Sequence, residues 1–331
     1  MTTYSQTIAN HKLLTAAAEQ DHTHLQLALQ HGADPNATDE LGNSALMFCM
    51  RDDHASLCCS LSLLKAGAFV NHQDCNGNTA LHLCCIQNAV LNATWLLGRK
   101  ADLNIRNNQG KTPLHIAAYM QNLSMIKLLL KLGADIHAKD NAGDTPLHAA
   151  IPIAKVDTIQ YLLEHGADAT VKNASGDSAI MLAVALKKRN CMDLLFRHIK
   201  DINEVNNSGE TMLYHSIFFH KSDVLRKLIS LGANLDTITT TGDSPLLRAA
   251  MEISHEKLHL LLNAGADINV TKSAKTPLHK NAARKIMEEY LKLQRRPRIN
   301  WPVFTPLQDG SSPRATASYN YSIPAYFPSN F

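Results

Sequence analysis

Four histidines recur three residues after a threonine or its equivalent, and imidazole is the side chain best suited to metal binding and proton transfer near neutral pH. They are His82, His115, His148 and His279. Metal ligation or catalysis would require these rings to converge on one point. Each ring lies in its own copy of a sequence repeat, and copies packed as neighbouring helices lie about 10 Å apart. We therefore interpret these histidines as structural and expect no metal, cofactor or catalytic residue.

Seven cysteines offer thiolate chemistry, but no two of them have the spacing of a zinc site. Cys49, Cys84 and Cys85 occupy positions that hold alanine in other copies, where a thiol packs as a small apolar side chain. We expect only Cys75, in a predicted turn, to be exposed. The odd number and irregular spacing indicate a reducing compartment. We expect a cytoplasmic protein or, alternatively, a bacterial effector that acts in a host cytosol.

The elements that position these residues repeat along almost the whole chain. When each segment is aligned on Thr112 of the stretch TPLHIAA, successive anchor residues follow one another in steps of 32 to 35 residues, mostly 33. A fixed period of this size is typical of a solenoid, in which each unit buries its apolar face against its neighbours. The anchors are His11, Ser44, Thr79, Thr112, Thr145, Ser178, Thr211, Ser244 and Thr276.

Each unit predicts two short helices and a turn. Thr112 can cap the first helix, and Pro113 suits its first position because an amide there would have no partner. A second apolar pattern runs over residues 123–132 and ends at Gly133, which tolerates the left-handed conformation that closes a helix. The polar residues from Asp135 to the next anchor predict a turn.

These segments resemble the ankyrin repeat through TPLHIAA at 112, TPLHAAI at 145, TALHLCC at 79 and GADIH at 133, and the resemblance covers roughly residues 10 to 293. It implies an all-α repeat solenoid of helix-turn-helix units with projecting β-hairpin loops and a concave recognition face. Two units lack the helix-ending glycine, with Lys100 and Ile199 nearby instead. At these two junctions we expect backbone strain of about 1 kcal/mol.

The repeat also sets the expected boundaries. We predict an N-terminal capping repeat over residues 1–43, seven repeats over 44–275, a truncated C-terminal cap over 276–296, and a tail over 297–331. The final unit is either such a cap or one longer helix. The second unit carries two extra residues around 51–55, which we interpret as a tolerated loop insertion.

The composition and the motifs of the chain limit the function classes that it can belong to. The net charge is +3 with 18% charged residues, which gives no electrostatic case for nucleic acid or an anionic membrane. No apolar stretch approaches eighteen residues. No nucleophile, metalloprotease or phosphate-binding motif stands in a suitable context, so an enzyme is the least supported function class. We expect a monomeric, non-enzymatic protein-interaction module that acts as an adaptor or scaffold.

The candidate binding residues are those that break the repeat. The resemblance places the seventh and eighth residues after each anchor at the exposed end of the first helix, facing a groove. From the third to the eighth unit many of them are apolar, which marks an interaction surface unless some, such as Ile153 and Leu186, turn into the core. The predicted partner-binding residues are Ile86, Tyr119, Met120, Pro152, Ile153, Leu186, Phe218, Phe219 and Met251.

Four acidic residues precede consecutive anchors, namely Asp144, Asp177, Glu210 and Asp243. They predict an acidic rim beside the groove, although carboxylates at helix starts are also favourable in any helix. Together with the apolar positions, they predict a partner segment, extended or helical, that carries apolar and basic residues.

The tail from Pro297 holds six of the twelve prolines and seven aromatic residues, a composition that favours extended conformations. Its aromatic side chains suggest a second hypothesis, in which the tail folds back and covers the apolar positions of its own array. The proposed tail anchors are Trp301, Phe304, Tyr326 and Phe327.

Overall fold

The computed structural model describes residues 2–50, 57–219, 221–269 and 277–294. The chain divides into two units, Met1–Leu293 and Gln294–Phe331, and the account below concerns the first. The loop insertion at 51–55 and the four tail anchors Trp301, Phe304, Tyr326 and Phe327 lie outside the described residues.

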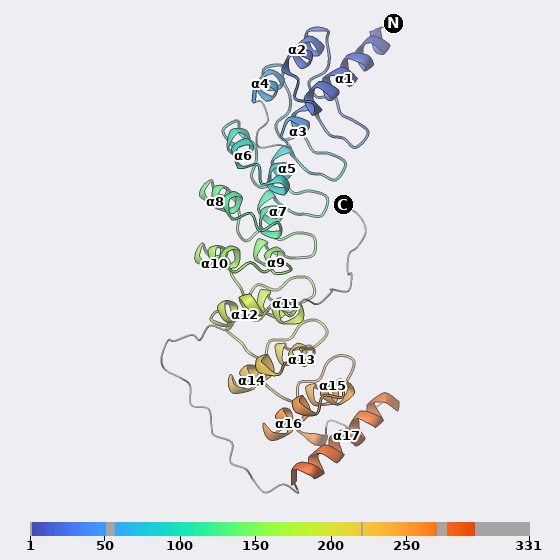
Figure 1. Ribbon diagram of the computed structural model, residues 1–331, viewed down its shortest axis with the longest axis vertical. Coiled ribbons are helices and arrows are strands. Elements are labelled where there is room, and N and C mark those ends of the chain that lie inside the picture. Colours follow the sequence, from blue (N-terminus) through green and yellow to red (C-terminus); the bar gives the residue numbers. More distant parts are fainter. Residues whose placement is uncertain (1, 51–56, 220, 270–276, 295–331) are drawn as a thin grey trace. The chain divides into compact units, whose positions relative to one another are not determined.

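Helices occupy most of the described chain, in the predicted pairs (Figure 1). The first helices of the repeats are α3 (Ala45–Cys49), α5 (Ala80–Gln87), α7 (Pro113–Tyr119), α9 (Pro146–Ala150), α11 (Ala179–Ala185), α13 (Met212–Ser216) and α15 (Pro245–Met251). The second helices are α4 (Leu57–Lys65), α6 (Val90–Leu97), α8 (Leu123–Lys131), α10 (Val156–Glu164), α12 (Arg189–Phe196), α14 (Asp223–Ser230) and α16 (His255–Asn263). The terminal helices are α1 (Thr2–Ala18), α2 (His22–Gln30) and α17 (Pro277–Gln294).

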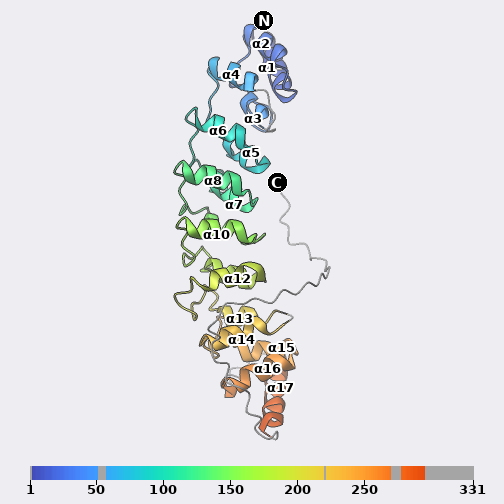
Figure 2. The ribbon, with the colours of Figure 1, turned by 60° about the vertical axis from the view of Figure 1, so that its left-hand side comes forward.

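The helices of the first unit form two layers, which Figures 1 and 2 show from two sides. Each first helix from α3 to α13 packs on the first helix of the next repeat and on the second helix of its own repeat. Leucine and alanine side chains such as Leu114, Ala117 and Leu129 fill the space between the layers and are fully buried. The predicted all-α repeat solenoid is therefore confirmed. In the described part of the chain, no helix is long and apolar enough to cross a bilayer.

The hairpins are held by their neighbours more than by β-structure of their own. Isolated antiparallel bridges join Thr38 to Ser44 and Val205 to Thr211. In the described hairpins from residue 75 to residue 240, the tip donates a backbone hydrogen bond to the tip before it, for example from the Ala174 amide to the Ala142 carbonyl at 2.8 Å. Each hairpin therefore depends on the position of the adjacent one.

The described part of the last repeat is one long helix, α17. The carboxylate of Glu289 on α17 is only 5% exposed and lies 2.6 Å from the His259 Nε2 atom on α16. Hydrogen bonds from Lys292 and His259 lower the pKa of Glu289 to about 2. This charged contact ties α17 to the preceding repeat.

The strain expected at the two irregular junctions is present at only one of them. Lys100 adopts the left-handed conformation with φ +66°. Around Ile199 the prediction is wrong, because no residue from 197 to 200 has a positive φ. Helix α12 instead ends at Phe196 with Arg197 at φ −70°, and the chain leaves through a turn in which the Ile199 amide bonds to the Phe196 carbonyl. A β-branched side chain thus avoids the strained region.

The sequence analysis missed a second set of left-handed residues. They lie nine residues after the anchor, in the turn between the first and second helices, and none is glycine. Their φ values lie between 55° and 60°, and they are Gln20, Asn88, Gln121, Ala154, Lys187 and Ile253. Left-handed conformations cost a non-glycine residue about 1–2 kcal/mol, so these turns store strain.

We expect Ile253→Gly to stabilise the protein by about 0.5–1 kcal/mol, because relief of left-handed strain exceeds the entropic cost of glycine. Ile253 is β-branched, has φ 55° and is 63% exposed, so little buried surface is lost. Urea unfolding measures the effect. Leu231 is the matched control, since it is 50% exposed but has φ −83°, and Leu231→Gly should destabilise. Equal effects of the two substitutions would show that the turn is not strained.

Candidate functional site

The anchor residues fix where each first helix begins and therefore where its end lies. In the fourth unit, Thr112 has an extended backbone and caps α7, whose first residue is Pro113. The last helical residue is Tyr119, seven residues after the anchor, and Met120 follows as the C-cap. The predicted binding positions therefore lie at the ends of the first helices or, after α9 and α13, just beyond them. We call the surface formed by the fourth, seventh and eighth residues after the anchors the first-helix face.

The recurrent histidines belong to the scaffold that holds this face. The His115 Nδ1 atom accepts hydrogen bonds from the backbone amide and the hydroxyl of Thr112, at 3.2 and 2.8 Å. Its Nε2 atom donates to the Asp144 carbonyl of the next unit at 3.0 Å. His82 and His148 make the same contacts.

Burial governs the protonation of these rings. It lowers the pKa of His82 to about 4 and also lowers the pKa of His115 and His148. A buried neutral ring with both nitrogens occupied binds no metal, and no cluster of three potential ligands occurs among the described residues. The side chain of His279 lies outside the described residues.

The cysteines are free thiols. Cys49, Cys84 and Cys85 are buried as predicted, and Cys75 is exposed. The prediction that Cys75 alone is exposed is wrong, because Cys58 is exposed as well. It precedes the buried Cys59 on α4, and adjacent helical residues point in different directions.

Most of the predicted apolar positions are accessible. The residues eight after the anchor form a ladder across three consecutive units, with Met120 36%, Ile153 45% and Leu186 42% exposed. The alternative that Ile153 and Leu186 turn into the core is therefore excluded. Those seven after the anchor are half-buried, namely Ile86, Tyr119, Pro152, Phe218 and Met251.

Phe219 is the exception, and its predicted exposure is wrong. Its side chain is 2% exposed, and the Arg189 guanidinium lies 5.3 Å from its ring centroid. Helix α14 starts at Asp223, twelve residues after Thr211, whereas α8, α10 and α12 start eleven residues after their anchors. Because Phe219 is buried, the ladder ends at Leu186.

The sequence analysis also missed the residues four after the anchor. They lie one helical turn before the seventh and eighth positions, on the same side of the helix. Phe48, Leu83, Ile116 and Leu182 are half-buried there and pack on the core. The i, i+3 and i+4 spacing within the first helix was the signal that could have found them.

The acidic residues before the anchors fall into two groups. Asp144 and Asp177 are half-buried and accept hydrogen bonds from the Asn173 and Asn206 amides, at 2.8 and 3.0 Å. Glu210 also accepts from Asn206 and lies 3.5 Å from the His215 Nε2 atom. In the described chain, no salt bridge joins these three carboxylates to a lysine or arginine.

Asp243 does not belong to an exposed rim, so that prediction is wrong. It is 8% exposed, and its carboxylate accepts from the Tyr214 hydroxyl at 3.4 Å. Tyr214 stands at the position that histidine occupies in other units, and its longer side chain reaches the carboxylate. The acidic row therefore consists of Asp144, Asp177 and Glu210.

Basic side chains of the second helices form ion pairs between adjacent repeats. Arg189 on α12 pairs with Asp223 on α14 at 2.8 Å, and Arg226 on α14 pairs with Glu256 on α16 at 2.9 Å. These charges are exposed and compensated, which is typical of a solvated outer surface.

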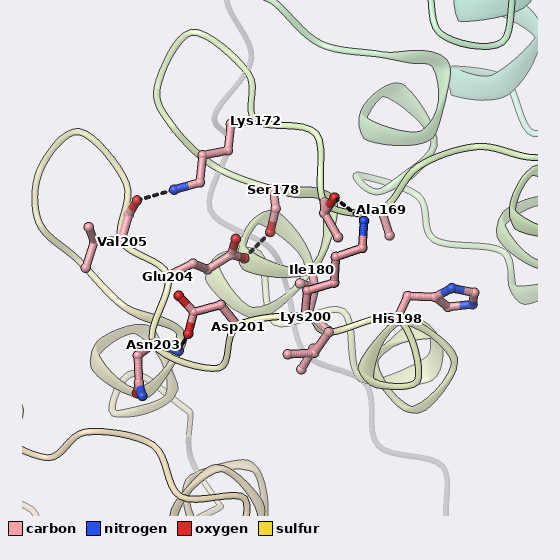
Figure 3. Close-up of a pocket in the computed structure, with 12 residues that line it drawn as sticks. Ala169, Lys172, Ser178, Ile180, His198, Lys200, Asp201, Asn203, Glu204 and Val205 are labelled. Carbon is pink, nitrogen blue, oxygen red and sulfur yellow. Dashed lines mark hydrogen bonds between the residues drawn. The ribbon is translucent and has the colours of Figure 1, made fainter.

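A cavity of about 390 Å³ lies at the irregular junction after α12, and Figure 3 shows its lining. Glu204 points into it and accepts a short hydrogen bond from the Ser178 hydroxyl. The equivalent positions in the fourth and fifth repeats hold the apolar residues Ala138 and Val171. Burial raises the pKa of Glu204, although Ser178 and Lys172 act in the opposite direction. The folded protein therefore prefers a neutral side chain here.

We expect Glu204→Gln to stabilise the protein at pH 7 by about 0.5–1 kcal/mol, a value reduced by partial solvent screening. The amide oxygen can still accept from Ser178. Because the pKa of Glu204 is raised in the folded protein, its carboxyl group destabilises the fold as the pH rises above the ordinary pKa of 4.5. Urea unfolding at pH 4 and pH 7 should show a gain only at pH 7. An equal gain at both values would contradict the electrostatic explanation.

Comparison with known proteins agrees with this geometry. The family described as Ankyrin repeats (3 copies) matches residues 13–107, 54–140, 92–173, 154–239 and 180–272. A similar protein is Inversin from Danio rerio, 37% identical over 87 residues. That alignment covers 26% of this chain and only 8% of the relative's length. The family match extends over most of the repeats described above, and the chain belongs to the ankyrin repeat family.

Proposed function

We propose that this protein is a non-catalytic recognition module, an adaptor or scaffold, that binds a partner segment across its first-helix face. Ankyrin repeats are protein-interaction modules. The observation that carries the proposal is the exposed ladder of Met120, Ile153 and Leu186, with the acidic row at the opposite end of the first helices. Apolar side chains aligned over three consecutive units are typical of interaction surfaces rather than of scattered surface residues.

The charges support a partner with basic residues. Asp144, Asp177 and Glu210 carry negative charge without a lysine or arginine partner in the described residues. Complementary charges on a partner would guide its approach and fix its register. On the second helices, Asp223 and Glu256 already pair with Arg189 and Arg226, so the first-helix face is the more attractive surface for a cationic segment.

The cysteines favour a reducing compartment for this activity. All seven are free, and five are buried among apolar side chains, where they pack rather than react. We therefore place the interaction in a cytosol.

A pull-down with paired variants tests the proposal. Ile153→Asp with Leu186→Asp places charge on the ladder, and both side chains are exposed, so we expect partner capture to be lost while the melting temperature changes little. Leu132→Asp with Leu231→Asp is the matched control, because these side chains are 47% and 50% exposed at the ends of second helices. Capture that survives the ladder substitutions, or is lost equally in the control, would contradict the proposed face.

A further inference from the structure

We infer that the segment recognised by the first-helix face is an amphipathic α-helix that lies across the first helices, with apolar residues at every seventh position and basic residues along one flank. The inference rests on the proposed function and names the conformation of the partner. It depends on the width of the face, the spacing of the ladder and the distribution of charge.

The width of the face fits a helix. In the sixth unit, Asp177 precedes the anchor and Leu186 lies nine residues further along, at the other end of α11. The seven residues of α11 rise about 1.5 Å each and the N-cap Ser178 before them is extended, so the two residues lie more than about 10 Å apart along the helix. A helix with its side chains is about 10–12 Å across, so it contacts both the acidic row and the ladder. A single extended strand directs successive side chains alternately towards and away from the face, so it lays one row of side chains on the face and reaches only one of them.

The spacing of the ladder sets the register. Met120, Ile153 and Leu186 follow one another at intervals of 33 residues on consecutive repeats, whose first helices α7, α9 and α11 pack on one another. Packed helices lie about 8–10 Å apart. Seven residues of a partner helix rise about 10.5 Å, so apolar residues at i, i+7 and i+14 meet successive ladder positions.

The acidic row of the first-helix face determines which flank of the partner helix is basic. The acidic row occupies the hairpin end of the first helices in the fifth to seventh units, and in the fourth unit Lys111 takes the corresponding place. A partner helix with lysine or arginine on its hairpin-facing flank pairs with Asp144, Asp177 and Glu210. A helix with acidic residues on that flank is repelled by the same row.

Synthetic peptides of about 21 residues, three heptads, test the inference. The helical probe carries leucine at every seventh position and lysine along one flank. A scrambled probe has the same composition, and an extended probe has leucine at every third position with prolines that prevent a helix. Fluorescence anisotropy measures affinity for the full chain, and far-UV circular dichroism measures helix formation on binding.

We expect the helical probe to bind at least about tenfold more tightly than the scrambled one and to gain helicity. Leu186→Asp should weaken its binding by about tenfold, since a buried leucine contributes about 1.5 kcal/mol or more. Leu132→Asp should have no effect. Asp177→Asn should weaken binding by about threefold and reduce its salt dependence, whereas Asp157→Asn, an exposed acid on α10, should not.

The outcomes separate the inference from the proposed function. If the extended probe binds more tightly than the helical one and responds to Leu186→Asp, the partner conformation is wrong while the first-helix face remains a binding surface. Equal affinity of the helical and scrambled probes would also overturn the inference. If neither the peptides nor the captured partner respond to the ladder substitutions, both the inference and the proposed function fail.

Discussion

Replacing His82 with alanine is expected to destabilise the protein by about 3 kcal/mol, because the ring is fully buried and joins two repeats. The Thr79 amide and hydroxyl bond to its Nδ1 atom at 3.1 and 2.9 Å, and its Nε2 atom bonds to the Lys111 carbonyl at 3.0 Å. Alanine leaves these groups without partners. Urea unfolding, with hydrogen exchange at the third and fourth units, measures the loss.

His82→Gln is the control that separates the cap from the bridge. A glutamine three residues after the N-cap can still reach back to the Thr79 amide, as in a capping box, but it does not replace the ring contact with Lys111. The free energy of unfolding of His82→Gln should lie between those of the wild type and of His82→Ala. If alanine and glutamine are equally tolerated at position 82, the histidine is not a structural bridge.

His82→Gln should also change how the stability of the protein depends on acid pH. The folded pKa of His82 is lowered to about 4 from the ordinary value of 6.5, so the unfolded chain takes up a proton that the folded chain refuses. Stability is therefore fully present above pH 6.5 and is lost as pH falls towards 4, by about 3 kcal/mol. Glutamine does not titrate, so His82→Gln should show a flatter dependence over this window. A parallel loss in both proteins would assign the acid response to other groups.

The period, the caps and the scaffold role of the histidines could be predicted because each depends on local chemistry that recurs along the chain. Thr112, Pro113 and His115 act within one helical turn, and their contacts follow from residue type and spacing. The buried cysteines could be predicted for the same reason, since their positions hold alanine in other copies. Exposure of Cys58 followed from the same helical geometry, given a buried Cys59.

The remaining features depend on contacts that no local signal reveals. Ile253 and Lys187 adopt left-handed turns without the glycine that normally marks them, because the packing of the two helices they connect dictates the turn. Phe219 is buried in a unit whose second helix α14 begins twelve residues after its anchor, and no local motif marks this difference. The cavity beside Glu204 lies between the irregular junction after α12 and the hairpin of the preceding repeat. Sequence reasoning therefore located the first-helix face but not which of its side chains are accessible.

The close approach of neighbouring hairpins leads to the second large effect. Gly143 has φ +74°, and a Cβ atom added there would lie 2.7 Å from the Ala174 amide nitrogen and 3.2 Å from the Asn173 carbonyl carbon. Both are backbone atoms, which cannot move aside as a side chain can. The Ala174 amide also donates to the Ala142 carbonyl, so the added methyl group displaces the bond that joins the two hairpins.

We therefore expect Gly143→Ala to cost about 3 kcal/mol, from left-handed strain of about 1 kcal/mol together with the clash and a lost hydrogen bond. Gly133 is the matched control, because it has φ +90° but no atom within 4 Å of an added Cβ. Gly133→Ala should cost only the strain, about 1 kcal/mol. Urea unfolding compares the two, and faster exchange of the Ala174 amide should accompany Gly143→Ala alone. Equal costs would mean that the neighbouring hairpin yields readily, and the hairpins would then contribute little to coupling between repeats.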